Sequence, residues 1–415
     1  VNVLQQFYNM ADTLIVGRVL GSNALAAVGS AYTLMTFLTS IFLGLSMGSG
    51  ALFSIYKGKN DQDSLRSAIV HAFALIMAVT VLLNVLVYIG IDPILHFLRV
   101  PDEVWDGMKA YLLVIFAGII ATSLYNYFSC LLRALGNSTI PLVFLAVSAV
   151  LNIGLDLLFV AVLPWGIRGA ALATVIAQYV SGIGITLYVL LKCRDLLPSG
   201  KDLHFNRQIL DEIGNLSSIT CIQQSVMNFG ILMVQGLVNS FGPVIMAAFA
   251  AAVKIDTFAY LPVQDFGNAY STFIAQNYGA GKKERIRRGT KESFLISFLF
   301  CIVISAVVCI FAAPLMRIFV SAKETAVIAS GVRYLRIEGA FYCGIGCLFL
   351  LYGYYRAVKK PGMSVILTVI SLGTRVALAY ILSAYIGETG IWIAIPIGWV
   401  FADITGLAYM KFQEK

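Results

Sequence analysis

Residues 9–18 of the chain read NMADTLIVGR, and they place a carboxylate, Asp12, in the middle of an apolar helix candidate. Gln5, Tyr8 and Asp12 fall on one helical face, whereas most of the surrounding residues are apolar. An aspartate near the centre of a bilayer costs roughly 2.5–3.5 kcal/mol, so such residues usually face the interior of a helix bundle and mark an ion or substrate path. The stretch therefore predicts a first helix that lines a cavity among other helices.

The composition is that of a polytopic membrane protein. Of the 415 residues, 59% are apolar and only 12% are charged, whereas soluble proteins average about 25% charged residues. The net charge of +8 comes from lysines and arginines clustered between long apolar segments, which is typical of membrane topology rather than of nucleic-acid binding. The seven cysteines form no CxxC pair and the three histidines are scattered, so the sequence predicts neither a metal cluster nor a catalytic one.

Apolar segments bounded by charges, Pro and Gly predict an all-α chain of twelve transmembrane helices. Lysines and arginines are concentrated after every second helix, so we expect both termini to lie in the cytoplasm. The chain starts without Met inside its first helix, and we expect residues upstream. The predicted helices are 1–19, 22–56, 62–91, 103–133, 139–162, 167–192, 207–240, 243–278, 284–319, 324–356, 361–385 and 390–411.

The second half of the chain repeats the first. GSNALAA at 21–27 aligns with GPVIMAA at 242–248, an offset of 221, and the same offset carries Arg66 onto Arg287. Because six helices return the chain to its starting side, the two repeats are parallel, and parallel repeats around a central cleft are a transporter design. The predicted domains are an N-terminal six-helix lobe (1–192), a cytoplasmic linker (193–206) and a C-terminal six-helix lobe (207–415).

Several motifs, in order and along essentially the whole chain, resemble the multidrug and toxic compound extrusion (MATE) transporters of the bacterial type. DTLIVGR (12–18) followed by ALAAVG (24–29) is similar to the first-helix signature of that family. RALGN (133–137) and QNYGAG (276–281) are similar to further conserved segments. The resemblance implies a secondary transporter and no enzymatic activity.

The resemblance also implies a cation-coupling site in the N-terminal lobe, formed by Tyr8, Asp12, Asn152, Asp156 and Thr174. The residues themselves support it, because Asn152 and Asp156 lie four apart on one face of an apolar helix. Two carboxylates in an apolar cavity must gain a proton, a metal ion or a cationic substrate. Amide and hydroxyl oxygens could complete a Na⁺ shell or a hydrogen-bond network around a protonated aspartate.

Further polar residues are candidates for the substrate cavity. They are Tyr111, Asn126 and Gln178 in the first half, and Asp256 and Glu338 in the second. For the last two, the default expectation is a structural ion pair, Asp256 with Lys254 or Glu338 with Arg375, because an isolated charge in a membrane is costly. The alternative is that Asp256 or Glu338 lines the substrate path.

The alternative for Asp12 and Asp156 is a purely structural role. The repeat argues against it, because Asp12 aligns with Met233 and Asp156 with Ala379, so neither carboxylate recurs in the second half. A carboxylate needed by the shared scaffold should be present in both halves.

Together these observations predict a multidrug efflux antiporter of the inner (plasma) membrane. It would exchange small amphipathic, cationic drugs or toxins for H⁺ or Na⁺, as a monomer in the lipid bilayer, with no nucleic-acid partner and no cofactor beyond the coupling ion. The alternative is a lipid-linked oligosaccharide flippase of the wider superfamily, which would need a basic cleft; only Lys254 and Arg375 could supply one.

Overall fold

The computed structural model describes residues 15–16, 19–20, 22–97, 102–193, 206–320 and 322–413, and these residues form helices and short turns without any strand. The helices are α2 (Ser22–Lys59), α3 (Gln62–Ile89), α4 (Ile91–Phe97), α5 (Asp102–Ile115), η1 (Phe116–Gly118), α6 (Ile119–Ala134), α7 (Thr139–Asp156), η2 (Leu157–Val162), α8 (Gly166–Lys192), α9 (Arg207–Asn239), α10 (Pro243–Gly279), α11 (Lys283–Ile310), α12 (Ala312–Phe319), α13 (Thr325–Gly339), α14 (Tyr342–Ala357), α15 (Pro361–Ile386) and α16 (Glu388–Gln413).

Most of these helices are suited to cross a membrane. Within the described residues, nine are long and apolar enough, and the count rises to ten if α13 and α14, bent by 52°, form one span. Of the other predicted spans, 243–278 corresponds to the 37-residue α10, which carries three ionisable residues, Lys254, Asp256 and Asp265. Most of the predicted span 1–19 lies outside the described residues.

The chain divides into two compact units, Val1–Cys221 and Ile222–Lys415. The predicted domain limits at residues 192 and 207 remain predictions, because most of the predicted linker lies outside the described residues.

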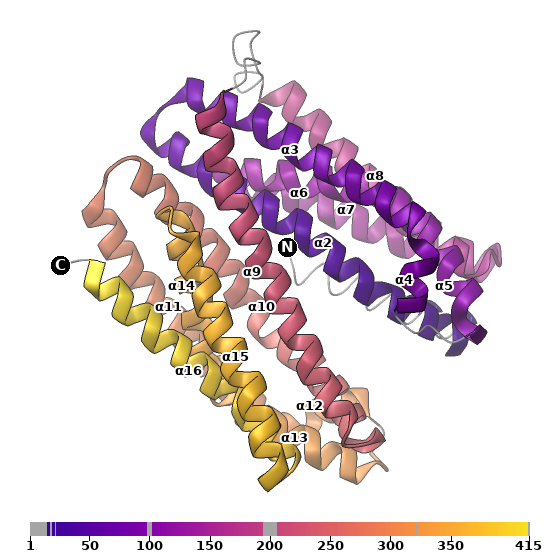
Figure 1. Ribbon diagram of the computed structural model, residues 1–415. Coiled ribbons are helices and arrows are strands. Elements are labelled where there is room, and N and C mark those ends of the chain that lie inside the picture. The colour runs from indigo at the N-terminus through magenta and orange to yellow at the C-terminus, as the bar shows by residue number, and fades with distance from the viewer. Residues whose placement is uncertain are drawn as a thin grey trace. The chain divides into compact units, whose positions relative to one another are not determined.

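In the first unit, α2 packs against α3, α5 and α6, and α8 packs against α6 and α7 (Figure 1). Two glycines of the GLSMGSG stretch, Gly44 and Gly48, let the first part of α9 approach α2 closely. A Cβ at Gly48 would lie 2.5 Å from the Cα of Ser217, and one at Gly44 would lie 2.6 Å from the Cα of Cys221. Ser49 Oγ and Ser217 Oγ then share a hydrogen bond of 3.0 Å. Small residues four apart commonly permit such contacts in membrane bundles.

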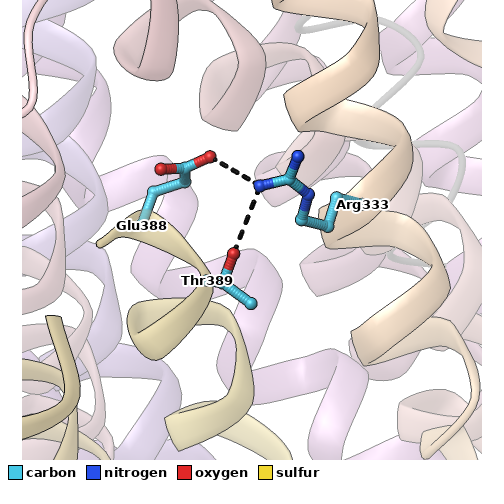
Figure 2. Close-up of polar contacts among 3 residues, drawn as sticks. All are labelled: Arg333, Glu388 and Thr389. Atoms are coloured by element: carbon cyan, nitrogen blue, oxygen red, sulfur yellow. Dashed lines mark hydrogen bonds and ion pairs between the residues drawn. The ribbon is translucent and has the colours of Figure 1, made fainter. Parts of the chain in front are cut away.

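In the second unit, α10 packs against α13 and α14, and α15 packs against α16 (Figure 1). Its apolar core includes the fully buried Trp392, whose ring stacks on Phe249 with the centroids 5.5 Å apart. The start of α16 is tied to α13 by Arg333, whose Nη1 donates to Glu388 Oε1 at 3.0 Å and to Thr389 Oγ1 at 3.3 Å (Figure 2). Half of the Arg333 side chain is exposed, and exposed pairs of this kind contribute about 0–1 kcal/mol.

Two helices of the first unit are irregular where the sequence predicted regular ones. The span predicted at 103–133 is interrupted by the 3₁₀ turn η1, and the span predicted at 139–162 ends in the π-helical turn η2. At η1, Asn84 Nδ2 donates to the carbonyl oxygen of Phe116 at 2.7 Å and Tyr179 Oη donates to that of Ala117 at 2.9 Å. Side chains of neighbouring helices therefore satisfy carbonyl groups at this break, as a lipid environment requires.

Candidate functional site

The polar stripe predicted on α7 lies against α8. Asn152 Nδ2 donates to Thr174 Oγ1 at 3.2 Å, and Thr174 Oγ1 donates to the carbonyl oxygen of Ala170 at 3.1 Å. One turn earlier, Ser148 Oγ donates to the carbonyl oxygen of Ala177 at 2.9 Å. Asn152 is only 2% exposed, and its Oδ1 has no hydrogen-bond partner within the described residues. The bridge to Thr174 therefore fixes the amide and leaves one buried carbonyl oxygen available for a ligand.

Asp156 follows Asn152 by four residues, on the same helical face, and its side chain is fully buried. It is the last residue of α7, immediately before η2, where the Leu163 amide donates to the Leu158 carbonyl in the five-residue pattern of a π-helix, at 2.8 Å. Single π turns inside α-helices are frequent at functional sites. This turn, which was not predicted from the sequence, sets the path of the chain directly after the carboxylate.

The other residues predicted for this site differ in burial where the structure describes them. Gln178 faces η1, so closely that a Cβ at Gly118 would collide with its Oε1, and this oxygen has no hydrogen-bond partner in the described part of the chain. Tyr111 is buried in α5, and Asn126 is half-buried in α6. Tyr8 and Asp12 lie outside the described residues. The structure thus brings Asn152 and Thr174 into contact, with Asp156 one turn from Asn152.

Asp256 of α10 and Glu338 of α13 form a second buried acidic site, in the second unit. They are 5% and 1% exposed, and their side chains interact with each other and with the charge of Arg375 on α15. Tyr334 Oη donates to Asp256 Oδ2 at 3.5 Å. Its ring also packs edge-on against Trp392, with centroids 5.0 Å apart. Two carboxylates and one guanidinium therefore share an apolar, aromatic pocket.

Neither ion pair considered for these acids is formed within 4.0 Å in the described residues. Lys254 is exposed, away from Asp256, and Glu338 lies against the other acid rather than in a direct salt bridge with Arg375. Asp256 Oδ1, Glu338 Oε2 and Arg375 Nε are buried without hydrogen-bond partners in the described regions. Asp256 nevertheless interacts with Glu338, Tyr334 and Tyr342, so these polar groups form one cluster.

Two tyrosines, Tyr334 and Tyr342, are aromatic partners of this acidic site that the sequence alone did not predict. Tyr334, Glu338 and Tyr342 are spaced by four residues along the chain, a pattern that could have indicated them. Tyr342 Oη is also buried, and it lies close enough to Asp256 for their side chains to interact.

These arrangements present oxygen atoms of the kinds that bind cations. Asp156, Asn152 and Thr174 present carboxylate, amide and hydroxyl oxygens, the donor types that suit a proton or a hard cation such as Na⁺. In the described residues, no three His, Cys, Asp or Glu side chains are grouped in a way that could hold a metal ion. The acidic pair of the second unit, partly balanced by Arg375, can accept a proton or a cationic group.

The chain matches a family model and is similar to several named bacterial proteins. The family model MatE matches residues 1–158 and 219–381. The chain is 28% identical to the Bacillus subtilis "Probable multidrug resistance protein YpnP", over 99% of this chain and 92% of that protein. It is 26% identical to the Thermotoga maritima "Probable multidrug resistance protein NorM", over 100% of this chain and 90% of that protein.

Solved structures share the fold. A MOP superfamily transporter from Pyrococcus furiosus superposes with a TM-score of 0.93 at 23% identity, covering 99% of this chain and 92% of the other. An outward-facing multidrug resistance MATE family transporter gives the same TM-score, identity and coverage. The predicted all-α polytopic membrane fold is confirmed. The chain belongs to the MatE family, whose members are membrane transporters and not enzymes.

Proposed function

We propose that this protein is a secondary active multidrug efflux antiporter, which exchanges small amphipathic cationic compounds for H⁺ or Na⁺. The names of its relatives, multidrug resistance and multidrug export proteins, support the substrate class. The observation that carries the proposal is the contact of Asn152 with Thr174 beside the fully buried Asp156. A carboxylate there is costly to leave charged without a counter-ion, so it is stabilised when an ion binds.

Antiport results if the ion and the drug compete to neutralise the negative charge of the same site. When one occupant compensates the charge of the site, the affinity for the other falls, and this negative coupling is reciprocal. In the proposed site, Asp12 and Asp156 bind the coupling cation, with Tyr8, Asn152 and Thr174 as supporting ligands. Tyr111, Asn126 and Gln178 belong to the adjoining substrate cavity, and Asp256 and Glu338 hold the positive group of the substrate in the second unit.

We further propose that the protein lies in the plasma membrane as a monomer with both termini in the cytoplasm. The distribution of lysines and arginines supports this orientation. A lipid-linked oligosaccharide flippase is less well supported, because Lys254 is exposed and Arg375 lies beside two acids that compensate its charge.

The test is drug resistance in a sensitive host that expresses each variant. Asp12→Asn and Asp156→Asn should each abolish resistance while membrane expression stays at the wild-type level. Asp211→Asn is the matched control, because that aspartate is 74% exposed and pairs only loosely with Arg207 at 4.0 Å. Wild-type resistance in both site variants would remove the coupling mechanism.

A further inference from the structure

The first turns of α11 carry a dense basic surface that the transport site does not use. Six lysines and arginines lie between residues 282 and 291, and all six side chains are exposed: Lys282, Lys283, Arg285, Arg287, Arg288 and Lys291. We call these six residues the basic collar. We propose that the basic collar binds the anionic headgroups of membrane phospholipids.

Most of the positive charges of the basic collar have no acidic side chain paired with them in the described residues. Arg288 Nε pairs with Glu292 Oε1 at 2.7 Å. The other five collar residues form no ion pair within the described residues. Five exposed cations on less than three helical turns repel one another, so an external anion would stabilise this end of the helix.

The collar continues directly into a surface that suits lipid chains. The apolar window of α11 has a mean hydropathy of 2.8 and is only 17% buried inside the protein, the lowest share among the nine described spans. Arg287, Lys291, Phe298 and Ile302 are separated by four, seven and four residues, so they lie on one helical face. Phe298 and Ile302 are 52% and 46% exposed. The same face therefore offers a charged end and an apolar length, as an anionic phospholipid does.

Membrane topology alone does not require so many charges. In the first half, the equivalent turn at residues 57–71 (offset 221) carries three basic residues and two acidic ones, whereas residues 278–292 carry six basic and two acidic. In that first turn Asp61 stands where the second half has Lys282, and it caps α3 by accepting from the Ser64 amide at 3.0 Å. The extra charge is thus specific to the second unit, and basic clusters beside a membrane span are typical anionic-lipid sites.

The experiment measures lipid binding to the purified full chain by native mass spectrometry, with phosphatidylglycerol as the probe and phosphatidylcholine as the neutral reference. The test variant is Lys283→Gln/Arg287→Gln/Lys291→Gln, in which three exposed residues keep good helix propensity. The matched control is Lys57→Gln/Lys59→Gln/Arg66→Gln, which removes the same charge from the equivalent turn of the first half. Each basic residue strengthens binding to an anionic surface about fivefold, so loss of three should weaken phosphatidylglycerol binding at least tenfold.

We expect the test variant to lose its preference for phosphatidylglycerol over phosphatidylcholine, while the control retains it and Lys283→Arg/Lys291→Arg behaves as the wild type. The preference should also weaken as salt is added, because salt screens exposed charges. An unchanged preference in the test variant, or an equal loss in the test and control variants, would overturn the proposal. Because no transport is measured, failure here would leave the proposed antiport untouched.

Discussion

At the scale of single residues, Asn152 is a buried polar side chain with few partners in the described part of the chain. Asn152 is fixed by one side-chain hydrogen bond to Thr174, and its carbonyl oxygen has no partner in the described residues. A hydrogen bond between membrane helices contributes about 0.6 kcal/mol on average and up to about 1.7 kcal/mol. Such a bond is weak enough to rearrange when an ion binds, and strong enough to orient the amide.

We therefore expect Thr174→Val to weaken ion coupling without unfolding the protein. Loss of the hydroxyl frees the Asn152 amide, so the coupling-ion concentration that gives half-maximal transport should rise about 3- to 15-fold. The matched control is Thr186→Val on the same helix, where the threonine Oγ1 bonds, among the residues that the structure describes, to the Gly182 carbonyl alone, at 2.6 Å. Equal shifts in both variants would show that the Asn152–Thr174 contact has no special role.

The acidic pair of the second unit leads to a prediction about stability. Arg375→Gln should lower the free energy of unfolding, because it removes the positive charge that acts on two buried acids. Glu338→Gln should be close to neutral, because the acid that it retains is balanced by Arg375.

Thermal unfolding of the purified variants would measure both effects, and Arg375→Gln/Glu338→Gln should recover part of the loss. A larger loss for Glu338→Gln than for Arg375→Gln would mean that the guanidinium does not compensate these acids.

The sequence predicted one of these residue clusters better than the other. Asn152 and Asp156 lie four apart on one helix, so helical periodicity alone places them on the same face, and Thr174 follows on the next predicted helix. Asp256 and Glu338 belong to helices that are far apart in the chain, and no pattern along a single helix predicts that they meet. The resulting expectation of separate ion pairs was reasonable on energetic grounds, but tertiary packing placed the acids together instead.

At the scale of helices, close packing depends on small residues at defined places. We expect Gly48→Ala to lower the free energy of unfolding by about 1–3 kcal/mol, because its Cβ would push the α2 and α9 backbones apart. Gly214→Ala on α9 is the control, since a Cβ there meets nothing within 4 Å. It should stabilise the protein by up to about 1 kcal/mol through helix propensity.

Thermal unfolding of the two alanine variants would measure the difference. Equal stability would show that the α2–α9 contact tolerates separation.

The 3₁₀ turn η1 and the π turn η2 could not be predicted from the sequence. Hydrophobic segments predict that a helix crosses the membrane, but a 3₁₀ or π turn shifts a hydrogen bond by one residue and leaves the apolar pattern unchanged. At η1, Asn84 and Tyr179, which come from other helices, donate hydrogen bonds to carbonyls of the turn. The hydrogen bonds that satisfy the carbonyls of η1 are therefore tertiary contacts, which the apolar pattern of one helix does not reveal.

At the scale of the whole molecule, the apolar segments were sufficient to predict the fold class. Long hydrophobic runs separated by charged turns define membrane spans directly, because the bilayer requires each span to satisfy its own backbone hydrogen bonds. The predicted helix limits agree with the structure to within a few residues for α8 (Gly166–Lys192) and α15 (Pro361–Ile386). They differ where spans break into two helices, as α13 and α14 do at a 52° bend.

The central claim is that one buried carboxylate site couples drug movement to an ion gradient. The most direct test reconstitutes the protein in sealed vesicles that contain a pH-sensitive or Na⁺-sensitive dye, and then imposes a gradient of a fluorescent organic cation. Antiport through this site predicts ion flux opposite to the drug, which Asp156→Asn abolishes and Asp211→Asn leaves intact. Drug movement without flux of either ion, or unchanged ion flux in Asp156→Asn, would contradict it.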